Sequence, residues 1–215
     1  HWDQINQKDL SAIGGPNRLP EKHLWQKAIN LSLNFAIGHG WSPQAWIPKQ
    51  IKKTSHVPTT NGLFSRQAIL QAGNFSQNYP LAGEDLDLGF RLQKQGQMLL
   101  FPSPIVINNY ADTYLDSLKR LFIFGSIQAQ KKSLLFYLSM PFIPLMLICI
   151  ILSFFWSFFL WAPGCYLLFL IFYSCFAVLK SQKKTAFLLP VFWLGQHLSY
   201  SLGETAGLLK NISKN

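Results

Sequence analysis

The feature that most constrains this chain is a long apolar stretch in its C-terminal half. Ser133 to Leu179 contains no charged residue. A helix needs about 20 apolar residues to cross a bilayer, so this stretch is long enough for two crossings. We therefore expect membrane-spanning helices at about 133–160 and 162–179, joined by a turn at Trp161-Ala162-Pro163-Gly164.

The residues that flank this stretch predict its orientation. Lys131 and Lys132 precede it, and Lys180, Lys183 and Lys184 follow it. Lysine and arginine concentrate on the cytoplasmic side of membrane helices. Both ends of the predicted pair are therefore expected to face the cytoplasm, in a multi-pass protein of the cytoplasmic (inner) membrane.

A third hydrophobic segment follows at about 185–205. It carries Pro190, Gly195, His197 and Glu204, and polar side chains at membrane depth are costly unless they are paired or face protein. The segment either crosses the membrane or dips into it and returns. His197 and Glu204 lie about two helical turns apart. They either form a functional pair or pack against the other spans.

Composition limits the partners. Of the 215 residues, 49% are hydrophobic and 13% are charged, with a net charge of +10. A positive charge suits nucleic acid, anionic lipid or phosphorylated substrates. No nucleic-acid motif accompanies it and the lysines lie beside apolar segments, so we expect membrane lipids and phosphates as partners and no nucleic acid. Three cysteines lie in apolar runs without metal-ligand spacing: Cys149, Cys165 and Cys175.

The N-terminal half combines short strands with short helices. The acids Glu84, Asp85 and Asp87 open a predicted helix that carries Leu81, Leu88 and Leu92 on one stripe. Gly96 ends this helix, and residues 97–101 read as a buried strand. Acids favour the first turn of a helix because of its dipole, so helix capping alone accounts for them. Further strands are expected to end near residues 14, 64 and 107, which indicates an α/β fold.

Two motifs resemble a known family. The run Gly83-Glu84-Asp85-x-Asp87-Leu88-x-x-Arg91-Leu92 follows the run Asn61-Gly62-Leu63-Phe64-Ser65-Arg66. Together they resemble the acceptor-side half of family 2 glycosyltransferases, which are inverting enzymes with a GT-A fold. The resemblance covers about Gly14 to Ser133. It implies a partial GT-A domain, the C-terminal half of a nucleotide-diphospho-sugar transferase fold, followed by an all-α transmembrane region of two or three helices.

The resemblance also implies roles for individual residues. Asp85 matches the catalytic base of the family. Asn61, Gly62, Arg66, Glu84 and Asp87 match segments that line the acceptor site. The alternatives are a turn asparagine at 61 and a surface arginine at 66.

A divalent metal, Mg or Mn, is implied as cofactor. In the family it is held mainly by a donor-binding half, which would lie upstream of His1. Many relatives complete the metal site with a histidine at about Asn108. An asparagine carbonyl oxygen is a weak substitute for that ligand.

Residues 112–132 are expected to form an amphipathic interfacial helix. Leu115, Leu118, Leu121 and Phe122 form its apolar stripe, and its basic residues suit the membrane surface. Lys119 and Arg120 are expected to contact a phosphate or lipid headgroups. The Gln-x-x-Arg-Trp motif of processive synthases does not occur in the chain, which favours transfer of a single sugar.

The expected organisation is therefore an acceptor-side domain at 1–111, the interfacial helix at 112–132, transmembrane helices within 133–209 and a tail at 210–215. The resemblance implies a membrane-bound, inverting, non-processive glycosyltransferase. It would use a nucleotide-sugar donor and a lipid-linked or polysaccharide-precursor acceptor, and as a fragment it would be inactive on its own. The alternative is a non-catalytic or degenerate membrane partner of a glycosyltransferase complex. A transporter subunit would need polar residues along the first two spans, which offer only scattered serine and cysteine.

Overall fold

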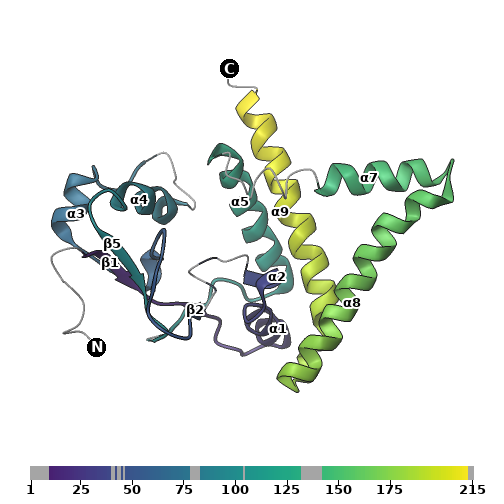
Figure 1. The fold of residues 1–215 in the computed structure, drawn as a ribbon, viewed down its shortest axis with the longest axis horizontal. Helices are drawn as coiled ribbons and strands as arrows, with labels where there is room; N and C mark the ends of the chain where they lie inside the picture. Colours follow the sequence, from purple (N-terminus) through teal and green to yellow (C-terminus); the bar gives the residue numbers. More distant parts are fainter. Residues whose placement is uncertain are drawn as a thin grey trace. The chain divides into compact units, whose positions relative to one another are not determined.

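The structure is a computed structural model of the chain. It describes residues 10–39, 42, 45, 47–77, 83–103, 105–131 and 142–212. The chain divides into two compact units (Figure 1). Unit 1 comprises His1–Pro20 and Leu33–Asn109, and unit 2 comprises Glu21–Ser32 and Tyr110–Asn215.

Unit 1 is a small α/β unit. Its strands are β1 (Leu10–Gly14), β2 (Asn17–Arg18), β3 (Lys52–Lys53), β4 (Gly62–Phe64), β5 (Gln97–Leu100) and β6 (Val106–Ile107). Its helices are α2 (Ala36–His39), the 3₁₀ turn η3 (Thr59–Asn61), α3 (Arg66–Gln71) and α4 (Glu84–Leu92).

Four strands of unit 1 form a mixed sheet in the order β3-β5-β1-β4. Strand β1 is parallel to β5 and antiparallel to β4, with Ala12 opposite Phe64. Strands β2 and β6 form a separate parallel pair. The sheet and α4 share a core that is built from Ala12, Val57, Ala68, Leu88, Leu92 and Met98.

The local predictions around α4 are confirmed. The helix begins at Glu84, and Leu88 and Leu92 are completely buried. The strand after Gly96 is β5. Leu81, the third residue of the predicted stripe, lies outside the described residues.

Unit 2 is helical. It contains α1 (Leu24–Ser32), α5 (Tyr114–Lys131), α7 (Phe142–Ser153), the 3₁₀ turn η4 (Ser157–Leu160), α8 (Trp161–Ser181), the 3₁₀ turn η5 (Lys184–Leu188) and α9 (Leu189–Ile212). Although α1 lies early in the chain, its contacts are with this unit. The buried Trp193 indole donates to Ser32 Oγ at 2.9 Å, and Gln26 donates to the carbonyl of Ala111 at 3.0 Å.

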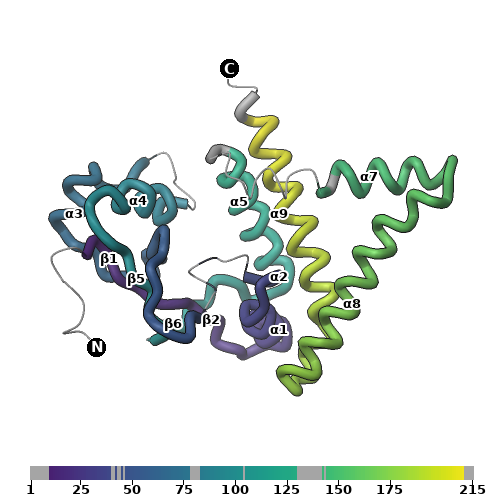
Figure 2. Tube along the Cα trace, viewed as in Figure 1, coloured from purple at the N-terminus to yellow at the C-terminus, as the bar shows by residue number. Residues whose placement is uncertain are grey.

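Helices α5 and α9 run side by side along much of their length (Figure 2). Small residues make this possible. Gly195, Ser199, Gly203 and Gly207 recur every four residues on α9, so they share one face. A Cβ at Gly203 would collide with the carbonyl oxygen of Phe122, and the Ser199 hydroxyl donates to the carbonyl of Leu118 at 2.6 Å.

The helix expected at residues 112–132 is α5, and its predicted apolar stripe is partly exposed. Leu115 is 64% exposed and Phe122 is 39% exposed. The buried positions of α5 include Ser117, Gly125 and Ala129, because the glycine-rich face of α9 accepts close backbone approach and not long side chains.

The turn predicted at Trp161–Gly164 is wrong. The chain turns at Phe154–Trp156, and α8 has already begun at Trp161. Pro163 is the third residue of α8, in the first turn of the α-helix, where proline is tolerated. A Cβ at Gly164 would meet no atom within 4 Å, so neither residue interrupts the helix.

One helix among the described residues is long and apolar enough to cross a membrane. It runs from Ser157 to Ser181 with a mean hydropathy of 2.0. Only 17% of its most apolar window is buried inside the protein, which is unlike the core helix of a globular domain. A shorter apolar helix covers Pro144–Ser153.

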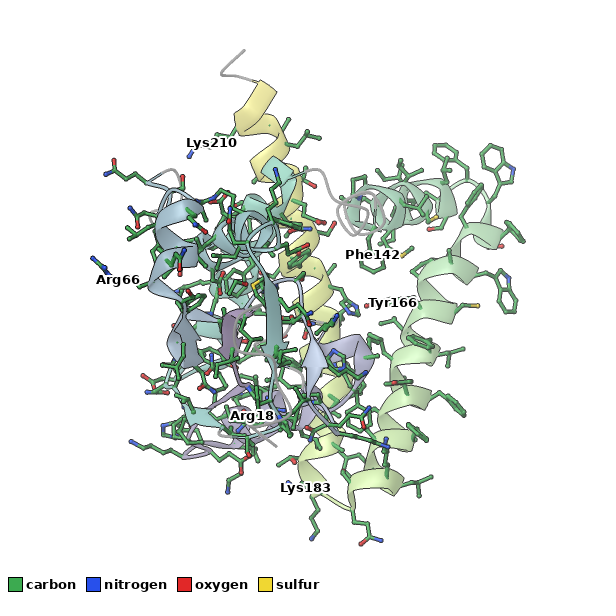
Figure 3. All side chains as sticks on the ribbon, turned by 60° about the vertical axis from the view of Figure 1, so that its left-hand side comes forward. Arg18, Arg66, Phe142, Tyr166, Lys183 and Lys210 are labelled. Carbon is green, nitrogen blue, oxygen red and sulfur yellow. The ribbon has the colours of Figure 1, made fainter. Side chains whose placement is uncertain are left out.

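A polar contact links α8 to α9 inside this apolar region. The Tyr166 hydroxyl lies 2.6 Å from His197 Nδ1, and the ring of Phe142 packs edge-on against Tyr166 with centroids 4.9 Å apart (Figure 3). His197 therefore pairs with Tyr166, a partner that the sequence did not indicate.

Candidate functional site

The start of α4 concentrates three carboxylates, and Asp85 is the most enclosed of them. Gly83, the N-cap, has a left-handed φ of 89° and supplies no side-chain cap. Asp85 Oδ1 accepts from the backbone N–H of Leu86 at 2.7 Å. Asp85 is only 7% exposed. Its carboxylate thus stabilises the first turn of its own helix, as the capping interpretation predicts.

Glu84 connects this helix to a second segment. Its Oε1 accepts from the Thr59 hydroxyl at 3.3 Å. Thr59 begins the η3 turn, which also contains Thr60 and Asn61. The first turn of α4 is therefore tied directly to the motif that contains Asn61.

Hydrogen bonds connect the η3 turn to the loop between β1 and β2. Asn61 Nδ2 donates to the carbonyl of Pro16 at 3.0 Å, and the Asn61 carbonyl accepts from Gly15 N–H at 3.0 Å. Asn17 Nδ2 donates to the Thr60 hydroxyl. Three segments that are distant in sequence, 15–17, 59–61 and 83–87, thus meet at one place in unit 1, which we call the α4 polar cluster.

Gly62 serves close packing. A Cβ at this position would lie 2.6 Å from Val57 Cγ1 and 2.8 Å from the carbonyl oxygen of Pro58. Any side chain would push β4 away from the Val57 segment. The structure therefore explains a glycine here by packing alone.

Asp87 makes an ion pair along its own helix. Its Oδ2 lies 2.7 Å from Arg91 Nη2. Arg91 also donates to the carbonyls of Ala72 and Asn74 at the end of α3. Asp87 thus orients the arginine that joins α4 to α3.

Arg66 lies apart from these contacts. It is the first residue of α3 and is exposed, and its side chain extends outward from the ribbon (Figure 3). The helix it opens is capped by Ser65, whose hydroxyl accepts from Ala68 N–H. Within the described part of the chain, the structure does not bring Arg66 to the three acids.

Lys119 and Arg120 belong to unit 2. Lys119 is exposed. The Arg120 guanidinium lies over two rings, 4.9 Å from the centroid of Tyr110 and 5.0 Å from that of Phe124. These cation–π contacts hold the side chain beside its own helix.

Side chains that commonly ligate metals are not grouped in the described part of the chain. Across 10–39, 47–77, 83–103, 105–131 and 142–212, no group of three or more His, Cys, Asp or Glu side chains is placed to hold a metal ion. Asn108 follows β6, and its N–H donates to the carbonyl of Arg18 at 2.8 Å. We therefore assign no chemical step to a metal in this part of the protein.

Sequence reasoning missed two residues of the cluster, Asn17 and Thr60. Their signal was weak, because asparagine after Gly-Gly-Pro and threonine before Asn-Gly are both ordinary turn residues. Only the folded chain shows that their side chains bond to each other.

The cluster combines carboxylates, threonine hydroxyls and asparagine amides. Groups of this kind bind ligands that carry hydroxyls, and a carboxylate among them can accept a proton. Comparisons of the chain with protein-family models, with curated proteins and with solved structures found no match.

Proposed function

We propose that this protein is a membrane-bound inverting glycosyltransferase. It transfers one sugar from a nucleotide-sugar donor to a lipid-linked or polysaccharide-precursor acceptor, with Asp85 as general base. One observation supports this most. The helix whose first turn contains Asp85 is tied through Glu84 and Thr59 to the turn of Asn61, and these are the two motifs that resemble the family.

The chemistry asks for a single base. An acceptor hydroxyl is a poor nucleophile at neutral pH, and a carboxylate that takes its proton as the new bond forms lowers the barrier. The nucleotide diphosphate leaves from the opposite face of the sugar, so inversion needs no second catalytic carboxylate. Glu84 and Asp87 then orient the helix start, in agreement with their contacts to Thr59 and Arg91.

The fold proposal concerns unit 1. The mixed sheet, in which parallel β1 and β5 are flanked by antiparallel β4 and β3, is assigned to the acceptor side of a GT-A domain. The divalent metal that the resemblance implies is assigned to the donor-binding part of such enzymes.

The membrane proposal extends the observed apolar helix. We assign a first span to about 133–153, before the turn at Phe154–Trp156, a second to Ser157–Ser181 and a third to about 185–205. All three cross the cytoplasmic membrane, with unit 1 on the cytoplasmic side. Support comes from the low burial of Ser157–Ser181 and from Lys180, Lys183 and Lys184 at its end. Such an anchor suits an acceptor that carries a lipid tail.

A second candidate is a non-catalytic membrane partner of a glycosyltransferase. It is favoured by the structural use of the site residues, because Asp85, Asp87 and Asn61 all bond within the fold. Such bonds stabilise a fold whether or not it catalyses a reaction.

Membranes that contain the full-length protein provide the test. They are incubated with a panel of radiolabelled nucleotide sugars, and labelled lipid is extracted and counted against membranes without the protein. Incorporation from at least one donor supports the enzyme. Absence of incorporation from every donor, with the protein present and folded, supports the non-catalytic partner.

A further inference from the structure

The side chain of Asn17 is half satisfied. Asn17 is 5% exposed, and its Nδ2 donates to the Thr60 hydroxyl. Its Oδ1 is buried and accepts no hydrogen bond in the structure. Native proteins seldom leave a buried amide oxygen in this state, because it has lost water without gaining a partner.

Exchanging the amide oxygen and nitrogen still leaves one buried amide atom without a hydrogen-bond partner. In the exchanged orientation the Thr60 hydroxyl would donate to the oxygen, and the NH₂ group would occupy the unpartnered position. A partner for this amide atom would therefore donate or accept, according to the orientation of the amide. A hydroxyl does both, whereas a phosphate oxygen only accepts and an ammonium only donates.

The unpartnered amide atom of Asn17 belongs to the α4 polar cluster. Asn17 bonds Thr60, and the adjacent Thr59 bonds Glu84, which precedes Asp85. Thr60 is exposed, so the amide is one hydrogen bond from the molecular surface. A ligand hydroxyl that enters beside the Thr60 hydroxyl could bond the unpartnered atom of the amide.

We propose that the Asn17 amide, with Thr60, forms a subsite for a hydroxyl of the acceptor saccharide. This inference rests on the proposed function and deepens it, because it names a neutral, polyhydroxylated ligand for the cluster. Asn17 is here a positioning residue. It holds the sugar by a hydroxyl other than the one that reacts, so that the reacting hydroxyl faces Asp85.

Steady-state kinetics of the full-length protein tests the kinetic consequence. Asn17→Ala removes the amide, and Asn109→Ala removes an exposed asparagine of the same unit. We expect Asn17→Ala to raise the KM for the lipid-linked acceptor about tenfold, the loss of one hydrogen bond, with the donor KM unchanged. Asn109→Ala should change neither. Equal acceptor KM values for Asn17→Ala and the wild type would overturn the proposal.

A binding measurement on the wild type avoids any question of misfolding and does not need turnover. The side-chain amide signals of Asn17 are followed by ¹⁵N NMR of the full chain in micelles, during titration with methyl glycosides of glucose, galactose and N-acetylglucosamine. At least one glycoside is expected to shift these signals, and inorganic phosphate is not. If no glycoside shifts the Asn17 signals, and these signals show only exchange with a bound water, the subsite proposal is overturned.

The two measurements separate the two proposals. If a glycoside shifts the Asn17 signals but the protein transfers no sugar, the hydroxyl subsite is supported and the transferase proposal is rejected. If the protein transfers sugar and Asn17→Ala leaves the acceptor KM unaltered, the transferase proposal is supported and the subsite is rejected.

Discussion

At the scale of single residues, the three acids of α4 have three different surroundings. Asp87 faces Arg91, Glu84 faces Thr59, and Asp85 is enclosed at the helix start. Their spacing in the sequence shows only that they share a first turn. The pairing of Asp87 with Arg91 follows from their i, i+4 spacing on one helix. The contact of Glu84 with the Thr59 hydroxyl depends on the η3 turn, which the fold brings to the start of α4.

Gly62→Ala should destabilise the protein. The new Cβ would overlap Val57 Cγ1 and the Pro58 carbonyl, and overpacking of this kind costs about 1–3 kcal/mol. Gly164→Ala is the matched control, because its Cβ meets open space and alanine favours a helix by about 1 kcal/mol. Thermal unfolding in detergent measures both. Equal melting temperatures for the two variants would contradict the packing argument.

Arg91→Ala should loosen the junction of α3 and α4. It removes charge-assisted donors to two carbonyls and the partner of Asp87, a loss of about 1–3 kcal/mol in the free energy of unfolding. The exposed Lys94→Ala on the following turn is the control and should lie within about 0.5 kcal/mol of the wild type. Urea unfolding compares them, and a similar stability for both variants would argue against the bridge.

His39 should make stability depend on pH. Its burial, and secondarily the nearby Arg18 guanidinium, lower its pKa below 6.5. The unfolded chain therefore binds a proton more readily than the folded one. The stabilisation is complete above about pH 6.5 and is lost as pH falls toward the lowered pKa. Between pH 7.5 and pH 5.5, the melting temperature should decrease more for the wild type than for His39→Gln. An identical decrease for both proteins would refute the role of His39.

At the scale of elements, the pairing of α5 with α9 organises unit 2. Both helices carry polar residues, and the seam between them is made from glycine and serine. Close backbone approach gives van der Waals contact and short hydrogen bonds such as that from Ser199 to Leu118. This seam packs α5 along its length against α9, which begins nearly sixty residues after α5 ends.

Gly203→Leu should separate these helices, because its side chain would collide with the backbone of Phe122. Ala206→Leu, at an exposed position of α9, adds comparable bulk away from the seam and serves as the control. We expect the former to lower the melting temperature in detergent by several degrees and the latter to leave it nearly unchanged. A tolerated Gly203→Leu would mean that the seam contributes little.

The elements that sequence reasoning located correctly are those with local signals. Helix α4 has acids at its start and a glycine after its end, and β5 is a short buried run. The turn at Phe154–Trp156 was missed because it has no glycine or proline, whereas Pro163 and Gly164 mark a turn that does not form. The seam was missed because small residues at every fourth position define no partner until a second helix lies against them.

At the scale of the whole molecule, the chain passes between its two units more than once. Residues 21–32 interrupt unit 1 and place α1 among the helices of unit 2, where Trp25 stacks on Tyr114 with ring centroids 4.5 Å apart. The predicted boundary at residue 111 lies next to the change of unit between Asn109 and Tyr110. The excursion of α1 has no local sequence signal, because an amphipathic helix does not specify which apolar surface it covers.

The site was predictable only in outline. The motifs located the segments around Asn61 and Asp85, and the fold ties them together through Thr59 and Glu84. The same motif predicts Arg66 as an acceptor-site residue, yet its side chain is exposed and extends away from the unit (Figure 3). Side-chain direction depends on packing, and α3 presents its buried face at Ala68 and not at its first residue.

The central claim is that the Asp85 carboxylate removes a proton from an acceptor hydroxyl. The most direct measurement compares Asp85→Asn with Asp112→Asn in the full-length protein, because the first change keeps shape and removes the base. We predict that Asp85→Asn lowers the transfer rate by at least about 100-fold, while donor binding and melting temperature match those of Asp112→Asn, which transfers normally. An Asp85→Asn protein that transfers sugar at the wild-type rate would contradict the account.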